Sequence, residues 1–123
     1  MGSPAEITPE TNAPVKQFDI MWATLPGPIG RRPVLLLTRT SAYAYLNKVL
    51  IAEVTSTIRS IPQEVPLGKQ EGLPGPAVIN LDNIHVIPRA LLGQRVGSLA
   101  PARHREIKRA LGYTLDWPEL KVL

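Results

Sequence analysis

The sequence predicts a mainly β (α+β) fold, in which a small, strongly bent antiparallel sheet or barrel is closed by a C-terminal helix. Five short apolar runs, most carrying Val or Ile, are bounded by Gly, Pro, Asn or Asp, as strands are. The 13 prolines among 123 residues fall between these runs, where proline ends helices and bounds strands. No regular helices separate the runs, which argues against a parallel α/β fold.

The expected strands follow directly from the apolar runs. They are Phe18–Ala23, Val34–Leu37, Val49–Val54, Ala77–Leu81 and Ile84–Ile87, with a candidate sixth near Arg95–Leu99. Ser41–Asn47 is expected to form a single helical turn. Pro101 suits the first turn of a helix and Gly112 its end, and Ile107, Ala110 and Leu111 then share one face.

Length and composition indicate one small domain. The chain has 123 residues and 13.5 kDa, and we expect residues 1–16 to be a flexible leader before a single domain at 17–123. No apolar run is long enough to span a membrane and no secretory signal is visible, so the cytoplasm is the expected location. With no cysteine and two histidines, Cys- or His-based metal sites are nearly excluded and no cofactor is expected.

The charge balance fits polyanionic or acidic partners. Lys and Arg number 14 against 10 Asp and Glu, giving a net charge of +4 and a pI near 9.8. Many proteins without such partners are also mildly basic, so the balance alone leaves both readings open.

The segment GRRPVLLL places two arginines before a predicted strand. Because the residue before proline favours extended geometry, Arg32 should stand at the strand entrance, where a planar guanidinium suits two phosphate oxygens. A solvated surface pair of Arg31 and Arg32 is the alternative.

A second candidate, EVTSTIR, ends the third strand in hydroxyl residues. In a regular strand Ile51, Glu53 and Thr55 share one face, so the Thr55 hydroxyl is available beyond the sheet edge. Turn formation is the alternative role for these hydroxyls. Glu53 would repel phosphate unless it is paired, and Arg59 is the expected partner.

Two further polar residues follow in INLDNIHVI. Asp82, between two predicted strands, has an Asx-turn as its ordinary role. His85 fits a core or surface position, because no Asp or Ser of a triad lies near it in the pattern.

Six segments in this order carry a resemblance to a known family: FDIMW, GRRPVLLL, VLIAEVTSTIR, P-x-EVPLG, GLPGPAVINLDNI and LGQRVGSLAP. Together, from about Phe18 to Gly112, they resemble the MazF/PemK family of toxin endoribonucleases.

That resemblance implies a homodimer of SH3-like barrels that cleaves single-stranded RNA without a metal, and an acidic MazE-like antitoxin as partner. It implies catalytic roles for Arg32, Thr55 and Asp82. The family pattern and the local chemistry together suggest RNA contacts by Trp22, Arg31, Ser56, Thr57, Arg59, Asn80 and His85. Tyr43 and Tyr45 are, with Trp22, candidates for stacking on bases.

Two other functions remain open at this point. One is a non-catalytic module that binds single-stranded nucleic acid or an acidic peptide with the same residues. The other is a CcdB-type toxin that shares the barrel and inhibits gyrase through protein contacts. RNA cleavage separates the first from the expected enzyme, and a supercoiling assay identifies the second.

Overall fold

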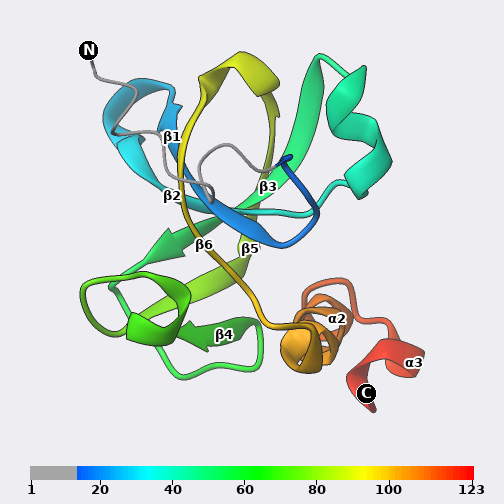
Figure 1. Cartoon of the computed structure of the whole chain (residues 1–123). Helices are drawn as coiled ribbons and strands as arrows, with labels where there is room; N and C mark the ends of the chain where they lie inside the picture. The colour runs from blue at the N-terminus through cyan, green and yellow to red at the C-terminus, as the bar shows by residue number, and fades with distance from the viewer. Residues whose placement is uncertain (1–13) are drawn as a thin grey trace.

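The computed structural model describes residues 14–123, and six strands within them form one antiparallel sheet. The strands are β1 (Asp19–Leu25), β2 (Gly30–Leu36), β3 (Lys48–Thr55), β4 (Glu64–Leu67), β5 (Ala77–Pro88) and β6 (Leu92–Ser98). Their order is β4-β5-β3-β2-β1-β6, and the sheet curls into a half-barrel with the C-terminal helices beside it (Figure 1). The expected mainly β class is confirmed.

The last strands differ from the expectation of two strands at Ala77–Leu81 and Ile84–Ile87. Both segments belong to the single strand β5, and both pair with β3. Between them the register jumps from Asn80 opposite Glu53 to Ile84 opposite Ala52, which leaves residues 81–83 as a bulge. The polar residues at this point therefore bend a continuous strand instead of ending it.

The bulge reverses which face of the sheet each β5 side chain occupies. Ile79, before the bulge, and Leu81, its first residue, belong to the apolar cluster beneath the C-terminal helix. After it, the odd-numbered Ile87 belongs to the cluster on the opposite face. His85 lies two residues before Ile87 in the regular part of the strand, so it shares the face of Ile87, Ile51 and Glu53.

The C-terminal helix α2 (His104–Thr114) follows a short 3₁₀ turn, η6 (Pro101–Arg103). Ile107 and Ala110 are buried against the sheet, as their spacing predicts. The expected end at Gly112 is wrong, because the helix continues to Thr114. The short helix α3 (Pro118–Lys121) packs so closely that a Cβ on Gly112 would lie 2.7 Å from the backbone nitrogen of Lys121.

Two apolar clusters occupy the two faces of the sheet. The first includes Ile20, Leu35, Val54, Ile79 and Ile107, and the second includes Met21, Val34, Leu36, Ile51 and Ile87. The 3₁₀ helix η3 (Thr40–Ala44) covers the second cluster with Tyr43. It begins one residue before the helical turn expected at Ser41–Asn47 and ends three residues earlier. The four central strands, β1, β2, β3 and β5, thus contribute apolar side chains to both faces.

The half-barrel is completed by a loop and not by strand pairing, since β6 pairs only with β1 among the described residues. The 3₁₀ helix η4 (Lys69–Glu71) lies against β6, and two glycines permit this approach. A Cβ on Gly97 would lie 2.1 Å from the Glu71 carbonyl oxygen, and one on Gly72, at φ +93°, would lie 2.2 Å from that of Val96.

The buried carboxylate of Asp19 ties the first described residues to the sheet. It accepts hydrogen bonds from Lys16, from Arg95 at 3.1 Å and from Ser98 at 2.9 Å. Residues 1–13, most of the predicted leader, lie outside the described residues. No helix within residues 14–123 is long and apolar enough to cross a membrane.

Candidate active site

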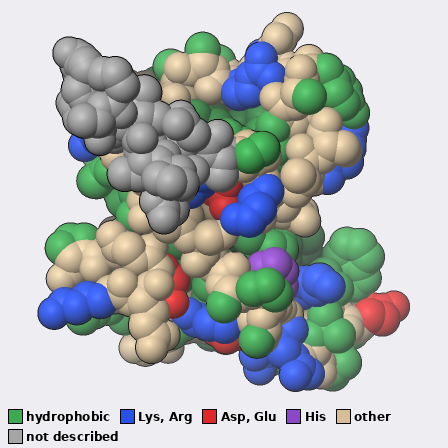
Figure 2. Space-filling view, in the orientation of Figure 1, with side chains coloured by type: hydrophobic (Ala, Val, Ile, Leu, Met, Phe, Trp, Pro, Cys, Tyr) green, Lys and Arg blue, Asp and Glu red, His purple; other side chains and the backbone are tan. Residues whose placement is uncertain are grey.

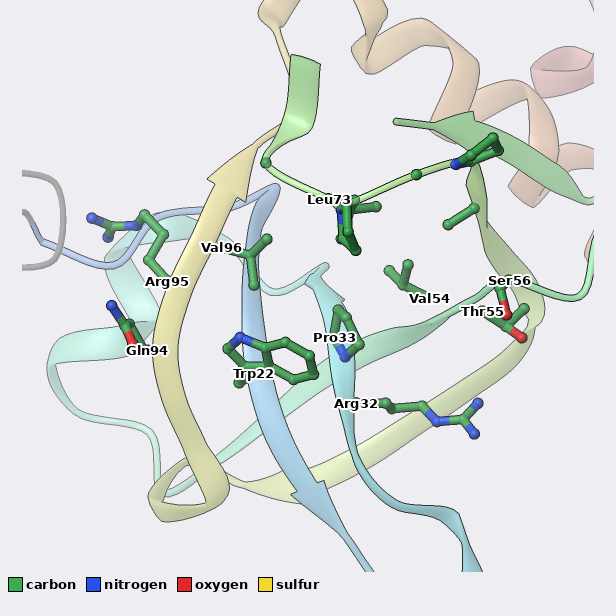
Figure 3. A pocket seen from close by; sticks show the side chains of 15 residues that line it. Trp22, Arg32, Pro33, Val54, Thr55, Ser56, Leu73, Gln94, Arg95 and Val96 are labelled. Atoms are coloured by element: carbon green, nitrogen blue, oxygen red, sulfur yellow. The ribbon is translucent and has the colours of Figure 1, made fainter. Parts of the chain in front are cut away.

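Arg32 and Thr55 line one cavity of about 730 Å³ at the ends of β2 and β3. The two strands are antiparallel, with Val34 opposite Glu53, so Arg32 and Thr55 project on the same face just beyond this pair. Figure 3 shows the Arg32 guanidinium and the hydroxyls of Thr55 and Ser56 toward the same end of the cavity. The structure thus brings together a cation and two hydroxyls.

The rest of the cavity wall is mainly apolar. Trp22 of β1, Pro33 of β2 and Val54 of β3 face the cavity between the catalytic candidates and β6 (Figure 3). The segment from Gly72 to Ala77, between η4 and β5, and residues 94–96 of β6 complete the wall. Both segments belong to stretches that carry the family resemblance, but the sequence did not place them at the site, because they reach it only through the curl of the sheet.

The Thr55 hydroxyl is held by its own turn. Its Oγ1 accepts a hydrogen bond from the backbone N–H of Thr57 at 3.1 Å. This contact uses a lone pair of the oxygen, so the hydroxyl proton stays available for donation. The expected turn-forming role and a donor role are therefore compatible at this residue.

Glu53 pairs with Arg32 and His85, so the expected pairing with Arg59 is wrong. The Arg32 Nη1 donates to Glu53 Oε1 at 2.8 Å, and Glu53 Oε2 is hydrogen-bonded to the imidazole Nε2 of His85. Arg59 lies beyond the strand end, where its backbone N–H donates to Glu64 at 3.0 Å. The β5 bulge explains the difference, because it turns His85 toward Glu53.

Arg31 and Trp22 form a second contact near the cavity. The Arg31 guanidinium carbon lies 4.0 Å from the centroid of the Trp22 ring, a cation–π arrangement across β1 and β2. The pair fixes the indole that forms part of the cavity wall. Tyr43, in contrast, is buried in the second cluster, where burial raises its pKa to about 12, and it cannot stack on a base. Tyr45, which follows η3, is exposed, and its ring lies under the guanidinium of Arg39, which precedes η3.

The remaining candidates occupy different positions. Asp82, in the bulge, accepts a hydrogen bond from the Thr114 hydroxyl at 3.2 Å and lines a separate groove of about 770 Å³ beside α2. Asn80 is buried, and its Oδ1 accepts from the backbone N–H of Asp82 at 2.9 Å, so the side chain that makes the local turn is Asn80 and not Asp82. Neither joins Arg32 and Thr55 within the described chain.

The described residues contain no group of three or more His, Cys, Asp or Glu side chains placed to hold a metal ion. The cavity instead presents a guanidinium, hydroxyls and an apolar wall. Such a set suits a phosphodiester, whose anionic oxygens need donors and whose attached base needs an apolar surface.

Comparisons with known proteins agree with this chemistry. The family described as the PemK-like, MazF-like toxin of type II toxin–antitoxin systems matches residues 16–115. The Mycobacterium tuberculosis (strain CDC 1551 / Oshkosh) protein Endoribonuclease MazF3 is 38% identical over 88 residues, which cover 70% of this chain and 85% of that protein.

Solved structures give the same relationship. The Mycobacterium tuberculosis toxin MazF-mt6 is 35% identical, with a TM-score of 0.76 over 80% of this chain and 96% of its own. An endoribonuclease from a mycobacterial species, solved in complex with its cognate antitoxin, is 27% identical, with a TM-score of 0.73 over 85% of this chain and 97% of its own. This chain belongs to the PemK-like, MazF-like family of type II toxins.

Proposed function

We propose that this chain is the toxin of a type II toxin–antitoxin system and acts as an endoribonuclease on single-stranded RNA. The observation that carries the proposal is the placement of Arg32 and Thr55 in one cavity, with the Thr55 hydroxyl proton free to be donated. Membership of the family and similarity to proteins named endoribonucleases support it.

The proposed reaction needs no metal, because RNA carries its own nucleophile. The 2′-hydroxyl attacks the adjacent phosphorus, and the products are a 2′,3′-cyclic phosphate and a 5′-hydroxyl. Arg32 holds nonbridging phosphate oxygens and offsets the charge that develops in the transition state, while Thr55 donates a hydrogen bond to the same oxygens. The apolar wall with Trp22 receives an unpaired base beside the scissile phosphate.

The proposed partners follow from the family and the charge. An acidic, MazE-like antitoxin would cover the RNA site of this basic chain, and a mycobacterial relative has been solved with its cognate antitoxin. A homodimer is the expected assembly, and the cytoplasm, where cellular RNA lies, is the expected place of action.

The decisive test uses a long, lightly structured RNA incubated with the purified protein in excess EDTA. We expect discrete cuts that leave 5′-hydroxyl ends, and we expect Arg32→Ala and Thr55→Ala to reduce them by about 100-fold or more. Mapping both ends of each product gives the cleavage motif at the same time.

Two outcomes would contradict this function. RNA binding by a folded wild-type protein without cleavage would indicate a non-catalytic binding module. Inhibition of DNA supercoiling without RNA cleavage would indicate a gyrase inhibitor.

A further inference from the structure

Glu53 is a buried carboxylate shared by two side chains that reach the surface. Its exposed fraction is 6%, whereas the side chains of Arg32 and His85 are 32% and 36% exposed. Each carboxylate oxygen has one of the two partners: Oε1 accepts from Arg32 and Oε2 contacts His85 Nε2. The three residues come from three neighbouring strands, β2, β3 and β5.

Stability alone gives little reason for this arrangement. Removing a carboxylate from water is costly, and a buried ion pair commonly stabilises a fold no more than apolar residues of similar volume do. What the arrangement does achieve is orientation, because both partners are held in fixed directions at a surface. Supporting hydrogen bonds of this kind are what preorganise the side chains of a functional site.

The contact with Glu53 also determines which imidazole nitrogen is free. A carboxylate paired with Arg32 accepts hydrogen bonds, so in the neutral imidazole of His85 the contact places the proton on Nε2 and the lone pair on Nδ1. The imidazole forms no other hydrogen bond within residues 14–123. Nδ1 is therefore available to accept a proton from a bound molecule.

We propose that His85 accepts the proton of the attacking 2′-hydroxyl, with Glu53 as the residue that positions both His85 and Arg32. This inference rests on the proposed function and adds to it the group that moves the proton. The charged groups that face His85 are Glu53 on β3 and, through it, Arg32 on β2. Asp82 is less suited to this step, since it lies in the groove beside α2.

The step balances as follows. The 2′-O–H proton passes to His85 Nδ1 while the O2′–P bond forms, and Arg32 and Thr55 bind the phosphate oxygens. The P–O5′ bond then breaks, and the leaving O5′ takes a proton from a water molecule. The imidazolium returns its proton to the hydroxide so formed, which regenerates neutral His85 and completes the cyclic phosphate and 5′-hydroxyl products.

The central variant is His85→Gln, because a glutamine amide can still donate to Glu53 but cannot accept a proton at neutral pH. Single-turnover cleavage at saturating RNA measures the chemical step. We expect a loss of about 100-fold or more, as for removal of a general base, with RNA affinity changed only severalfold. A general base has to be unprotonated to act, so the wild-type rate should fall at acid pH, and His85→Gln should lack this acid limb.

The matched control is His104→Gln, which changes the other histidine of the chain. His104 packs against Phe18, with ring centroids 4.4 Å apart, and its Nε2 lies 3.1 Å from the Leu99 carbonyl oxygen at the start of the C-terminal segment. Below its melting temperature this variant should keep both the wild-type rate and the acid limb.

Two further measurements separate proton transfer from a structural role. Added imidazole should restore part of the cleavage by His85→Ala, which a merely structural histidine would not allow. Glu53→Gln should lower kcat more than it changes KM, and the ring ¹⁵N spectrum of His85 should show loss of the Nε2–H tautomer. Circular dichroism verifies that each variant is folded.

The outcomes distinguish the two proposals. Cleavage by His85→Gln at near the wild-type rate, with the acid limb retained, would overturn the role of His85 and leave the endoribonuclease function intact. A wild-type chain that cuts no RNA would overturn the proposed function and this inference with it.

Discussion

Arg32 meets two demands with one guanidinium. Its Nη1 donates to Glu53, and in the proposed reaction the terminal N–H groups that Glu53 does not use bind the phosphate. Its Nε is buried and has no hydrogen-bond partner among the described residues. Within the described chain the guanidinium is therefore held by hydrogen bonding at Nη1 alone. A lysine ammonium is a point charge that cannot bridge a carboxylate and a phosphate in one plane.

Arg32→Lys should therefore lower the cleavage rate by about 100-fold, the cost typical of losing a transition-state donor. Rates of RNA cleavage at saturating substrate measure the effect. Arg39→Lys is the control, because Arg39 lies over Tyr45 at the ends of η3 and does not line the cavity. Cleavage by Arg32→Lys within severalfold of wild type would mean that charge alone suffices at this position.

Thr55 offers a second test at the level of one oxygen atom. Thr55→Ala should reduce cleavage by about 100-fold, since it removes both the donated hydrogen bond and the acceptor for Thr57. Thr55→Ser keeps the hydroxyl and should retain most of the rate. Equal losses in the two variants would show that the methyl group, and not the hydroxyl, is what matters.

Among the elements, the contact between η4 and β6 depends on glycine. Gly97→Ala places a Cβ 2.1 Å from the Glu71 carbonyl oxygen, so backbone has to move, and overpacking of this kind costs about 1–3 kcal/mol or more. Urea denaturation measures the loss in the free energy of unfolding. Gly75→Ala is the control, because nothing lies within 4 Å of its Cβ position. An unchanged midpoint for Gly97→Ala would contradict the close packing of η4 on β6.

The start of α2 is held by charge, which gives a pH-dependent contribution to stability. Arg103 donates to both carboxylate oxygens of Glu106, at 2.9 and 2.8 Å, and this contact lowers the pKa of Glu106 below its ordinary 4.5. A lowered pKa in the folded state means stability that is present above about pH 4.5 and lost as the pH falls through the folded value.

The wild type should thus lose more stability than Glu106→Gln between pH 6 and pH 3. Melting temperatures across this range measure the difference, and the two curves should converge at the acid end. Parallel curves would mean that the contact of Glu106 with Arg103 does not contribute.

The sequence predicts most of the helices and strands but not all of them. The apolar runs locate β1, β2, β3 and α2 because each buries a regular face. The sequence analysis does not predict β4, because its four residues, Glu64–Leu67, include a proline and are too few to show an alternation of apolar and polar side chains. It divides β5 because Asp82 and Asn83 resemble a turn, and only the pairing of both halves with β3 shows one strand.

Over the whole molecule, the excess of basic residues should govern RNA affinity. Figure 2 shows Lys and Arg side chains spread over this view of the molecule, with a smaller number of acidic side chains among them. The logarithm of the binding constant should fall linearly with the logarithm of the salt concentration, by about 0.7 for each phosphate contact on a single strand.

Arg31→Gln should reduce that slope by about 0.7, and Arg39→Gln should leave it unchanged, because Arg39 precedes η3 and does not line the cavity. Titrations of a labelled, uncleavable 2′-deoxy oligonucleotide at several salt concentrations give the slopes. An affinity independent of salt would contradict the electrostatic part of RNA binding.

The sequence predicts some residues of the candidate site but not the contacts between them. Arg32 and Thr55 are candidates from their positions beside predicted strands, and it is the family resemblance that assigns them catalytic roles. The link of Glu53 to His85 could not, because His85 is 32 residues further along the chain. In a regular strand without the bulge, His85 would lie on the same buried face as Ile79, away from Glu53.

The bulge in β5 makes the length of this segment more important than its composition. Residues 81–83 are the extra residues that turn His85 toward Glu53 while Ile79 and Leu81 stay in the core. Substitutions there leave that parity unchanged, but the insertion or deletion of one residue would exchange the faces of His85 and Ile84. Among relatives that share this site, natural variation at the bulge should therefore consist of replacements, with single-residue gaps rare.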